Sequence, residues 1–258
     1  MAWKTKTNAS EICQSMHVTL GLQKVIFAEK TPMLEIVYQD EHLIAINKPH
    51  GLLVHRSSIA NDAKEFALQL LRDQVGKKVS PVHRLDRKTG GLLLFAFEKE
   101  VEIAMHMQFQ ESLVEKKYKA VLRGFAPDSQ DIDYPLAKDN GVLQEAYTSF
   151  ITLNRAELAV PFGKHTTSRY SLVEATPTTG RMHQLRKHFA HIFYPIIGDR
   201  KHGCNKQNKL FKEQWEMTTM LLHASELQFT HPVTKENVHL KADFQDEFKR
   251  VLEIMNWV

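Results

Sequence analysis

The chain has 258 residues, enough for one large domain or two modest ones, and its 43% hydrophobic and 25% charged residues are ordinary for a globular protein. The net charge of +4, from 34 Lys and Arg against 30 Asp and Glu, does not by itself indicate a polyanionic partner. Two cysteines are too few for a disulfide framework or a four-thiolate zinc site, which favours a reducing compartment such as the cytoplasm. No hydrophobic run approaches the roughly 20 residues that span a bilayer, so no membrane partner is expected.

The first 32 residues differ from the rest of the chain. They are polar around a mildly apolar stretch, 17–28, and lack the hydrophobic centre and the small residues of a signal peptide. We predict that 1–32 is a loosely ordered N-terminal extension. Residues 33–258 contain no linker rich in Gly, Ser or Pro, and are predicted to form one domain.

Apolar patterning predicts both strands and helices after residue 33. Short alternating or continuous apolar runs predict strands. These runs are 34–38, 43–47, 79–82, 92–97, 113–122, 146–153, 169–175, 221–230 and 238–241. Apolar residues at helical spacing predict helices. These segments are 61–75, 99–109, 181–191, 205–217 and 243–255. The acidic segment 124–141 is predicted to be a connector without regular structure.

The polar segment 83–92 is predicted to form a turn at an edge of the sheet, and it holds the first candidate site residue. Asp86 lies between Arg84 and Arg87, and nearby positive charge favours the ionised form of a carboxylate. In a cleft, this carboxylate could act as a base, a nucleophile or a metal ligand; on the surface, it would be an ordinary ion pair. The two glycines that end the turn permit a close approach of backbone or ligand.

Tyr118 lies in the fifth predicted strand, with lysines on both sides. A tyrosine in a strand is usually a packing residue. In a cleft that holds an extruded base, however, its ring could stack on the base and its hydroxyl could take part in proton transfer. Basic residues cluster in 116–119, 181–191, 200–202 and 206–212. If folding brings these segments together, they would form a cationic face suited to a phosphate backbone.

The third predicted helix carries residues that suit two different kinds of site. His183, His188 and His191 suggest a metal, as in a metal-dependent hydrolase, but they lack the i, i+4 pair and the glutamate of the His-Glu-x-x-His zinc helix. Arg186 could instead form a two-pronged pair with a carboxylate, for which Asp86 is the obvious partner. Its spacing alone favours a solvent-facing or phosphate-facing side chain.

Three segments in series resemble the signature motifs of the RluA class of pseudouridine synthases, which modify ribosomal RNA and tRNA. These segments are 83–86 with the following glycines, 117–118, and 179–186 with His188, while 47–49 and 223–224 also fit the pattern. The resemblance extends over about 33–242. It departs from the class at Gly90, where serine is common, and at Met182, where threonine is common.

The resemblance implies an α+β fold with a mixed, largely antiparallel sheet, flanking helices and a central basic cleft. It implies an RNA pseudouridine synthase that needs neither metal nor cofactor, because the isomerisation of uridine involves no net redox change. The implied catalytic residues are Asp86, Tyr118 and Arg186. The implied RNA-binding residues are Arg84, Lys117, Arg181 and Lys187.

The resemblance also implies a role for each residue of the site. Asp86 would attack C1′ of the ribose, remove its 2′ proton or add to C6 of the base, and the sequence leaves these three routes open. Arg186 would hold Asp86 ionised, and Tyr118 would stack on the uracil and help to remove the C5 proton. Arg84 would fill the gap left when the uridine flips out of its stem.

The substrate is expected to be structured RNA. Segments 51–57 and 197–203 resemble those of the class members that modify uridine 65 of tRNA, so this uridine is the predicted target. Ribosomal RNA is the alternative substrate, and a non-catalytic RNA-binding protein is the alternative function. The protein is expected to act in the cytoplasm as a monomer.

Overall fold

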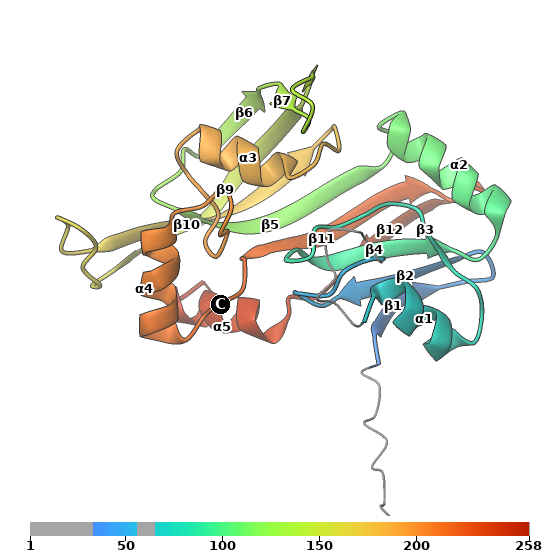
Figure 1. The fold of residues 1–258 in the computed structure, drawn as a ribbon, viewed down its shortest axis with the longest axis horizontal. Helices are drawn as coiled ribbons and strands as arrows, with labels where there is room; N and C mark the ends of the chain where they lie inside the picture. The colour runs from blue at the N-terminus through green and yellow to red at the C-terminus, as the bar shows by residue number, and fades with distance from the viewer. Residues whose placement is uncertain (1–32, 56–64, 258) are drawn as a thin grey trace, which may run out of the picture. The chain divides into compact units, whose positions relative to one another are not determined.

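The computed structural model of the chain describes residues 33–55 and 65–257. The predicted extension, 1–32, and the predicted start of the first helix, near residue 61, lie outside these residues. The described residues fall in one unit, Pro32–Val258, in which helices pack on a large sheet (Figure 1).

Strands make up the centre of this unit. Their bounds are β1 (Glu35–Gln39), β2 (Leu43–Lys48), β3 (Ser80–Pro81), β4 (Gly90–Ala96), β5 (Glu115–Arg123), β6 (Ser129–Asp133), β7 (Leu136–Ala137), β8 (Leu143–Gln144), β9 (Tyr147–Leu158), β10 (Ser168–Pro177), β11 (Leu222–Thr230) and β12 (Asn237–Lys241). The main sheet has the order β1-β2-β4-β11-β5-β10-β9-β6, with β12 beside β11 and β3 beside β4, while β7 and β8 pair separately. Within the described residues, β4 and β11 are the only two strands that pair in parallel. The predicted mixed, largely antiparallel sheet is confirmed.

Helices are present in all five predicted segments. Their bounds are α1 (Ala67–Val75), α2 (Lys99–Gln110), α3 (Gln184–His191), α4 (Asn205–Trp215) and α5 (Asp246–Ile254). Gly76 ends α1 as predicted, with a left-handed backbone whose N–H donates to the carbonyl of Arg72. The third helix starts at Gln184, later than predicted, so Arg181 and His183 lie in the turn before it.

Two sequence-based predictions about the sheet are wrong. The connector predicted over 124–141 contains β6 and β7, whose apolar side chains Ile132 and Leu136 are buried; its acidic residues obscured the strand pattern. The turn before β4 does not lie at an edge of the sheet, because β4 runs between β2 and β11. Every residue of β4 is buried, as expected for a continuous apolar run in a central strand.

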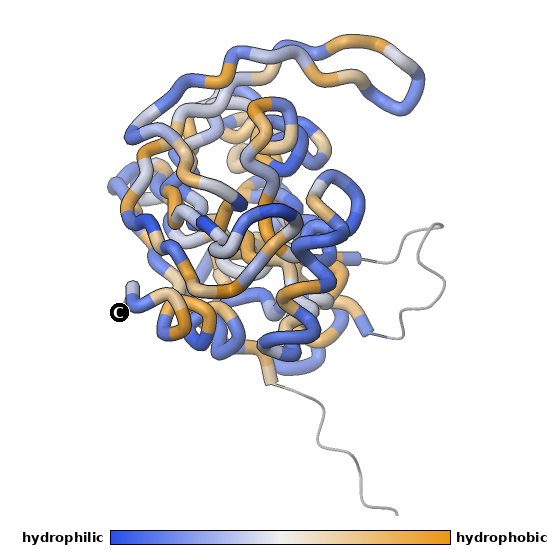
Figure 2. Tube along the Cα trace, turned by 90° about the vertical axis from the view of Figure 1, so that its left-hand side faces the viewer, coloured by the Kyte–Doolittle hydropathy of each residue, from blue (hydrophilic) through white to orange (hydrophobic). Residues whose placement is uncertain are grey.

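The core lies between the sheet and the helices. Leu71 of α1 packs with Ile46 and Phe95 of the sheet, and Phe189 of α3 stacks edge-on against Phe150 at 5.4 Å between ring centroids. Burial of a Phe or Leu side chain of this kind stabilises the fold by roughly 1.5–3 kcal/mol. Hydrophobic and hydrophilic residues alternate along much of the chain (Figure 2), because the strands expose their two faces to different surroundings.

At Gly91, the backbones of β4 and β11 approach each other closely. Gly91 pairs with Ala224 across the parallel β4–β11 contact and has a φ of +105°. A Cβ at this position would lie 2.7 Å from the backbone nitrogen of Ala224, and closer still to its carbonyl oxygen. This position therefore requires glycine for both its conformation and its space.

The Gly91→Ala variant is expected to lower the free energy of unfolding by about 3 kcal/mol or more, because a strained φ and a backbone overlap add together. Chemical denaturation would measure the loss. Gly180→Ala is the matched control, since its Cβ would have nothing within 4 Å, and a change within about 0.5 kcal/mol is expected. Equal stability of the two variants would contradict this explanation.

Gly90, where the RluA class commonly has serine, makes room for His50. A Cβ at Gly90 would lie 2.8 Å from Nε2 of His50 and 3.1 Å from Nε2 of Gln245. His50 is held in this position by its Nδ1 at 2.8 Å from the carbonyl oxygen of Lys88 and by its backbone N–H, which donates to Gln245. The lack of a side chain at Gly90 therefore leaves room for the imidazole of His50.

Candidate active site

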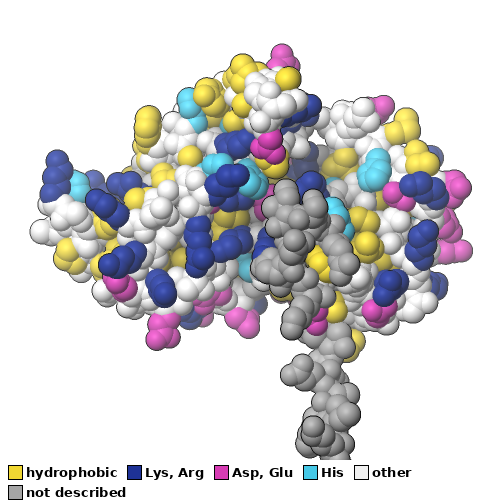
Figure 3. All heavy atoms as spheres, viewed as in Figure 1, with side chains coloured by type: hydrophobic (Ala, Val, Ile, Leu, Met, Phe, Trp, Pro, Cys, Tyr) yellow, Lys and Arg dark blue, Asp and Glu magenta, His cyan; other side chains and the backbone are white. Residues whose placement is uncertain are grey.

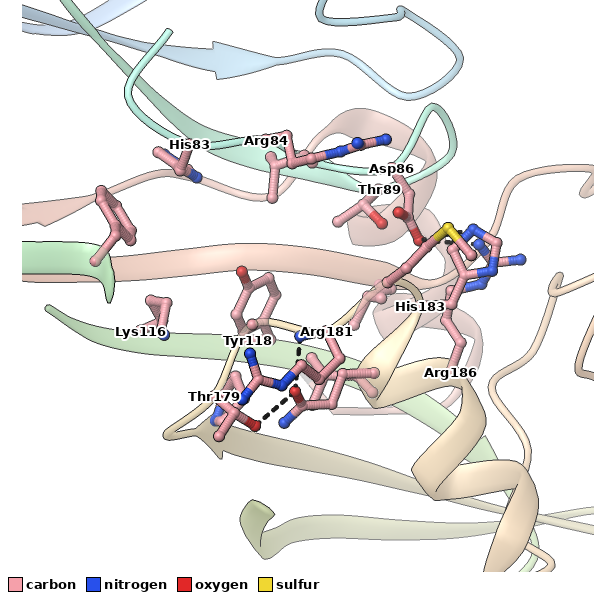
Figure 4. A pocket seen from close by; sticks show the side chains of 18 of the residues that line it. His83, Arg84, Asp86, Thr89, Lys116, Tyr118, Thr179, Arg181, His183 and Arg186 are labelled. Atoms are coloured by element: carbon pink, nitrogen blue, oxygen red, sulfur yellow. Dashed lines mark hydrogen bonds and ion pairs between the residues drawn. The ribbon is translucent and has the colours of Figure 1, made fainter. Parts of the chain in front are cut away.

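A cavity of about 540 Å³ lies where the turn before β4, the strand β5 and the turn before α3 meet (Figure 4). Its volume is within the range of about 300–1,000 Å³ that is usual for ligand sites. The charged and polar side chains that line it include Arg84, Asp86, Lys116, Tyr118, Thr179, Arg181, His183 and Arg186. Asp86 is the only carboxylate among the described residues of the lining.

Asp86 and Arg186 meet across this cavity. Nη1 of Arg186 donates to Oδ2 of Asp86 at 2.9 Å, although the two residues are 100 positions apart in sequence. The backbone N–H of Thr89 donates to the carbonyl of Asp86 and closes the turn that presents the carboxylate. The Asp86 side chain is 22% exposed, so it remains open to a ligand while it is paired (Figure 4).

Arg186 is held in turn by a second carboxylate, that of Asp199. Its Nε and Nη2 donate to the two oxygens of Asp199 at 2.7 and 2.9 Å, a two-pronged pair in which Asp199 is 1% exposed. Burial alone would raise the pKa of Asp199, but hydrogen bonds from Arg186 and from the backbone N–H groups of His202 and Lys201 lower it overall. Arg186 is therefore fixed at one end and presents its free nitrogen to Asp86.

Lys48 lies beneath the turn that carries Asp86. Its side chain is fully buried, and its Nζ donates to the carbonyls of Pro49, Leu52 and Arg87 at 3.0, 2.9 and 3.3 Å. Burial lowers the pKa of Lys48 to about 7, against the opposing effect of the charge on Asp86. Lys48 thus links the loop after β2 to the turn that carries Asp86.

Tyr118 projects from β5 into the cavity, between Lys116 and Asp86 (Figure 4). Burial, and then the negative charge of Asp86, raises the pKa of Tyr118 above its ordinary value. The hydroxyl is therefore protonated at neutral pH, and Tyr118 would meet a ligand as a neutral phenol.

The three histidines proposed as metal ligands make separate contacts. The ring nitrogens of His188 lie 3.0 Å from Oγ1 of Thr148 and 3.0 Å from the carbonyl oxygen of Tyr134. The ring of His191 stacks on that of Tyr134 with centroids 3.6 Å apart, while His183 faces the cavity. Over residues 33–55 and 65–257, no group of three or more His, Cys, Asp or Glu is arranged to hold a metal ion.

His183 lies beside the ion pair in a left-handed conformation, with a φ of 57°. Its Nε2 is 3.8 Å from Oδ2 of Asp86, and its Nδ1 is 2.9 Å from Nε2 of His202. Burial lowers the pKa of His183, while the charge of Asp86 opposes this effect. A neutral His183 can donate a hydrogen bond to, or accept one from, a ligand bound next to Asp86.

The predicted RNA-binding residues lie in two different positions. Arg84 and Arg181 line the cavity, and Arg84 is exposed to solvent. Lys117 and Lys187 lie outside its lining, and Nζ of Lys117 is 3.6 Å from a carboxylate oxygen of Glu174. RNA binding by all four residues stays a prediction.

Basic side chains also gather outside the cavity. Lys206, Lys209 and Lys212 lie on α4, and Arg200 and Lys201 lie in the turn before it. Figure 3 shows Lys and Arg side chains spread over the part of this face that α4 occupies. Two of the four segments of the predicted cationic face, 200–202 and 206–212, thus lie next to each other, while Lys117 and Lys119 pair with Glu174.

Sequence reasoning missed four residues of the site, namely Lys48, Lys116, His183 as a neighbour of Asp86, and Asp199. Asp199 lies in the segment 197–203 that carries the resemblance, but nothing in its spacing indicates a pair with Arg186. Lys48 and Lys116 have ordinary neighbours in sequence, and only the fold shows that they are buried.

The largely antiparallel mixed sheet is the fold of solved RNA pseudouridylate synthase domains. The chain belongs to the RNA pseudouridylate synthase family, whose pattern matches residues 42–191. The resemblance to the RluA class is thereby confirmed, and the protein is an RNA pseudouridine synthase. No helix among the described residues has the length and apolar character needed to cross a membrane.

Curated relatives cover most of the chain. The sequence is 43% identical over 235 residues to the tRNA pseudouridine synthase C of Vibrio parahaemolyticus, covering 87% of this chain and 96% of that protein. It is 41% identical over 236 residues to the protein of the same name from Haemophilus influenzae, covering 87% and 99%.

Two solved human structures share the fold. Human RNA Pseudouridylate Synthase Domain Containing 1 superposes with a TM-score of 0.68 at 21% identity, covering 88% of this chain and 96% of that one. Human RNA Pseudouridylate Synthase Domain Containing 4 gives 0.67 at 25% identity, covering 86% and 93%. These similarities confirm the predicted fold.

Proposed function

We propose that this protein converts a uridine of tRNA, at position 65, to pseudouridine, with Asp86 as the catalytic carboxylate. The observation that carries the proposal is the 2.9 Å pair between Asp86 and Arg186 inside a basic cavity that also holds Tyr118. The relatives named tRNA pseudouridine synthase C support tRNA as the substrate. The resemblance of segments 51–57 and 197–203 supports position 65.

In the proposed reaction, the target uridine leaves its stem and enters the cavity. Asp86 reacts at the ribose or the base, the glycosidic bond to N1 breaks, and C5 of the rotated uracil joins the ribose. Arg186 balances the charge of Asp86 and fixes its direction. Tyr118 stacks on the uracil, and its hydroxyl passes its own proton on as it accepts the proton from C5, while the uracil gains one proton at N1. Arg84 fills the gap that the flipped uridine leaves between the stacked bases of the stem.

Phosphate contacts would hold the RNA around this cavity. Arg181, on the cavity wall, and Lys187, nearby on α3, are proposed to bind the backbone, a contribution to affinity that salt weakens. The enzyme is proposed to act as a monomer in the cytoplasm, where its RNA is processed.

Mapping of pseudouridine in tRNA and ribosomal RNA, from cells with and without this protein, tests the proposed substrate. The expected result is the loss of one mark, at position 65 of tRNA. Addition of the purified protein to unmodified tRNA transcripts is expected to restore it. A lost mark in ribosomal RNA, with tRNA unaffected, would overturn the substrate assignment.

The Tyr118→Phe variant is expected to bind RNA as the wild type does, because the ring that stacks on the base remains. Its turnover is expected to fall by about 10²-fold or more, the usual contribution of a proton-transfer group. Single-turnover rates of pseudouridine formation at saturating enzyme would measure the effect.

Tyr170→Phe is the matched control for this variant. Tyr170 is a buried tyrosine of β10 whose hydroxyl donates to Gln207, outside the cavity lining. Its loss should cost about 1 kcal/mol of stability and leave turnover unchanged. Unchanged turnover in Tyr118→Phe would remove that hydroxyl from the proposed reaction.

A further inference from the structure

Lys116 is a buried cation in the cavity that has no counter-ion there. The residue is 9% exposed and lines the cavity from β5, two positions before Tyr118. Across the described parts of the chain, its ammonium has neither a hydrogen bond nor an ion pair. Lys117 and Lys119 alternate to the other side of the strand, where Nζ of Lys119 lies 2.5 Å from Glu174.

The surroundings of Lys116 offer no compensating charge. His83 and Phe109 line the same part of the cavity, with their rings stacked at 4.8 Å between centroids. His83 is neutral at physiological pH, because burial, and then the charge of Lys116, lowers its pKa to about 3. The one carboxylate of the described lining, Asp86, already receives a hydrogen bond from Arg186. A ligand that enters the cavity can therefore supply the opposite charge.

We infer that Lys116 is a phosphate-binding residue, which takes a backbone phosphate of the nucleotide that enters the cavity. This inference rests on the proposed function and adds a contact to it. A phosphate is the group of RNA that carries a full negative charge, whereas the uracil carbonyls are neutral, so a phosphate would best compensate the charge of this largely buried lysine. Two strand positions separate Lys116 from Tyr118 by roughly 6–7 Å, which is comparable to the span of one nucleotide.

Lys116 and Lys119 form a matched pair for the test, because they lie on the same strand and face opposite sides. The affinity of Lys116→Gln and Lys119→Gln for an unmodified tRNA transcript would be measured over a series of KCl concentrations. Each phosphate contact contributes about 0.7–0.9 to the slope of log K against log salt. The slope of Lys116→Gln is expected to fall by this amount, while that of Lys119→Gln stays at the wild-type value. An unchanged slope in Lys116→Gln would overturn the inference.

Two further variants separate ligand binding from a structural role. Lys116→Arg keeps the charge and is expected to keep the wild-type slope. Lys116→Met removes an unpaired buried charge, so its melting temperature is expected to equal or exceed that of the wild type. A lower melting temperature for Lys116→Met, together with an unchanged salt slope, would identify Lys116 as a structural residue and contradict the proposal.

The outcome for Lys116 is separate from the outcome for the enzymatic reaction. Salt slopes report the phosphate contact, and pseudouridine formation by the wild-type protein reports the proposed function. If the wild type binds the transcript with a slope that depends on Lys116 but forms no pseudouridine in it, the proposed substrate fails and the phosphate contact stands. If turnover of Lys116→Gln falls with an unchanged slope, the phosphate assignment fails and the enzymatic function stands.

Discussion

The Asp86→Asn variant is expected to form pseudouridine at a rate at least about 10³-fold below that of the wild type, on the order of the losses seen when a catalytic nucleophile is removed. Asparagine keeps the size of the side chain and an oxygen that can accept the hydrogen bond from Arg186, so the fold should be retained. RNA binding is expected to remain largely intact. Tritium release from C5-labelled uridine in tRNA transcripts would measure turnover, and filter binding would measure affinity.

Asp73→Asn is the matched control for this experiment. Asp73 lies on α1 with its side chain 63% exposed, and within the described ranges its side chain pairs with the neighbouring Arg72 alone. The same chemical change there should leave both turnover and binding at wild-type values. Substantial activity in Asp86→Asn would eliminate Asp86 as the catalytic carboxylate. A loss of RNA binding equal to the loss of turnover would favour a binding role instead.

The Arg186→Met variant is expected to lose about 3–5 kcal/mol of stability, because Asp199 is left as a buried charge without its cation. Pseudouridine formation should fall as well, because Asp86 loses the group that fixes its direction. Urea denaturation followed by circular dichroism would measure the stability. Arg169→Met is the control, since Arg169 is an exposed residue that pairs at the surface with Glu157, and a change within about 0.5 kcal/mol is expected there.

The pH dependence of this variant tests the cause of its instability. In the wild type, the lowered pKa of Asp199 contributes stability above the ordinary aspartate value of 3.8, and this contribution is lost as the pH falls through the lowered pKa. In Arg186→Met, burial of the ionised carboxylate is uncompensated, and protonation relieves it. The stability difference between the two proteins is therefore expected to narrow as the pH falls from 7 to below 3.8. A difference independent of pH would indicate lost packing rather than an unpaired charge.

Most of the fold could be predicted from local patterns, because the helices and most of the strands bury one apolar face. The β1–β2 hairpin, α2, and the end of α1 at Gly76 lie where the sequence places them. The strand β6 was missed because Ile132 is the only apolar residue among its five, so its sequence has no strand pattern. Hydrogen bonds to β9 hold it in the sheet. The central place of β4 follows from pairing with β11, which local sequence does not encode.

The site could be predicted only in part, and for a similar reason. Asp86, Tyr118 and Arg186 were found because they lie in motifs that resemble a known family. Asp199 and Lys116 depend on contacts and burial that form only when distant segments meet. Charged residues of this kind are therefore the hardest to predict from one sequence, because their burial and their partners are set by the folded structure and not by neighbouring residues in the chain.

Completion of the cavity during synthesis requires the C-terminal third of the chain. A nascent chain leaves the ribosome with its N-terminus first, so β4 and the turn that carries Asp86 emerge long before β11, Arg186 and Asp199. Contacts that are so far apart in sequence form slowly. The ion pairs of Arg186 with Asp86 and Asp199 consequently form only after synthesis has passed residue 199.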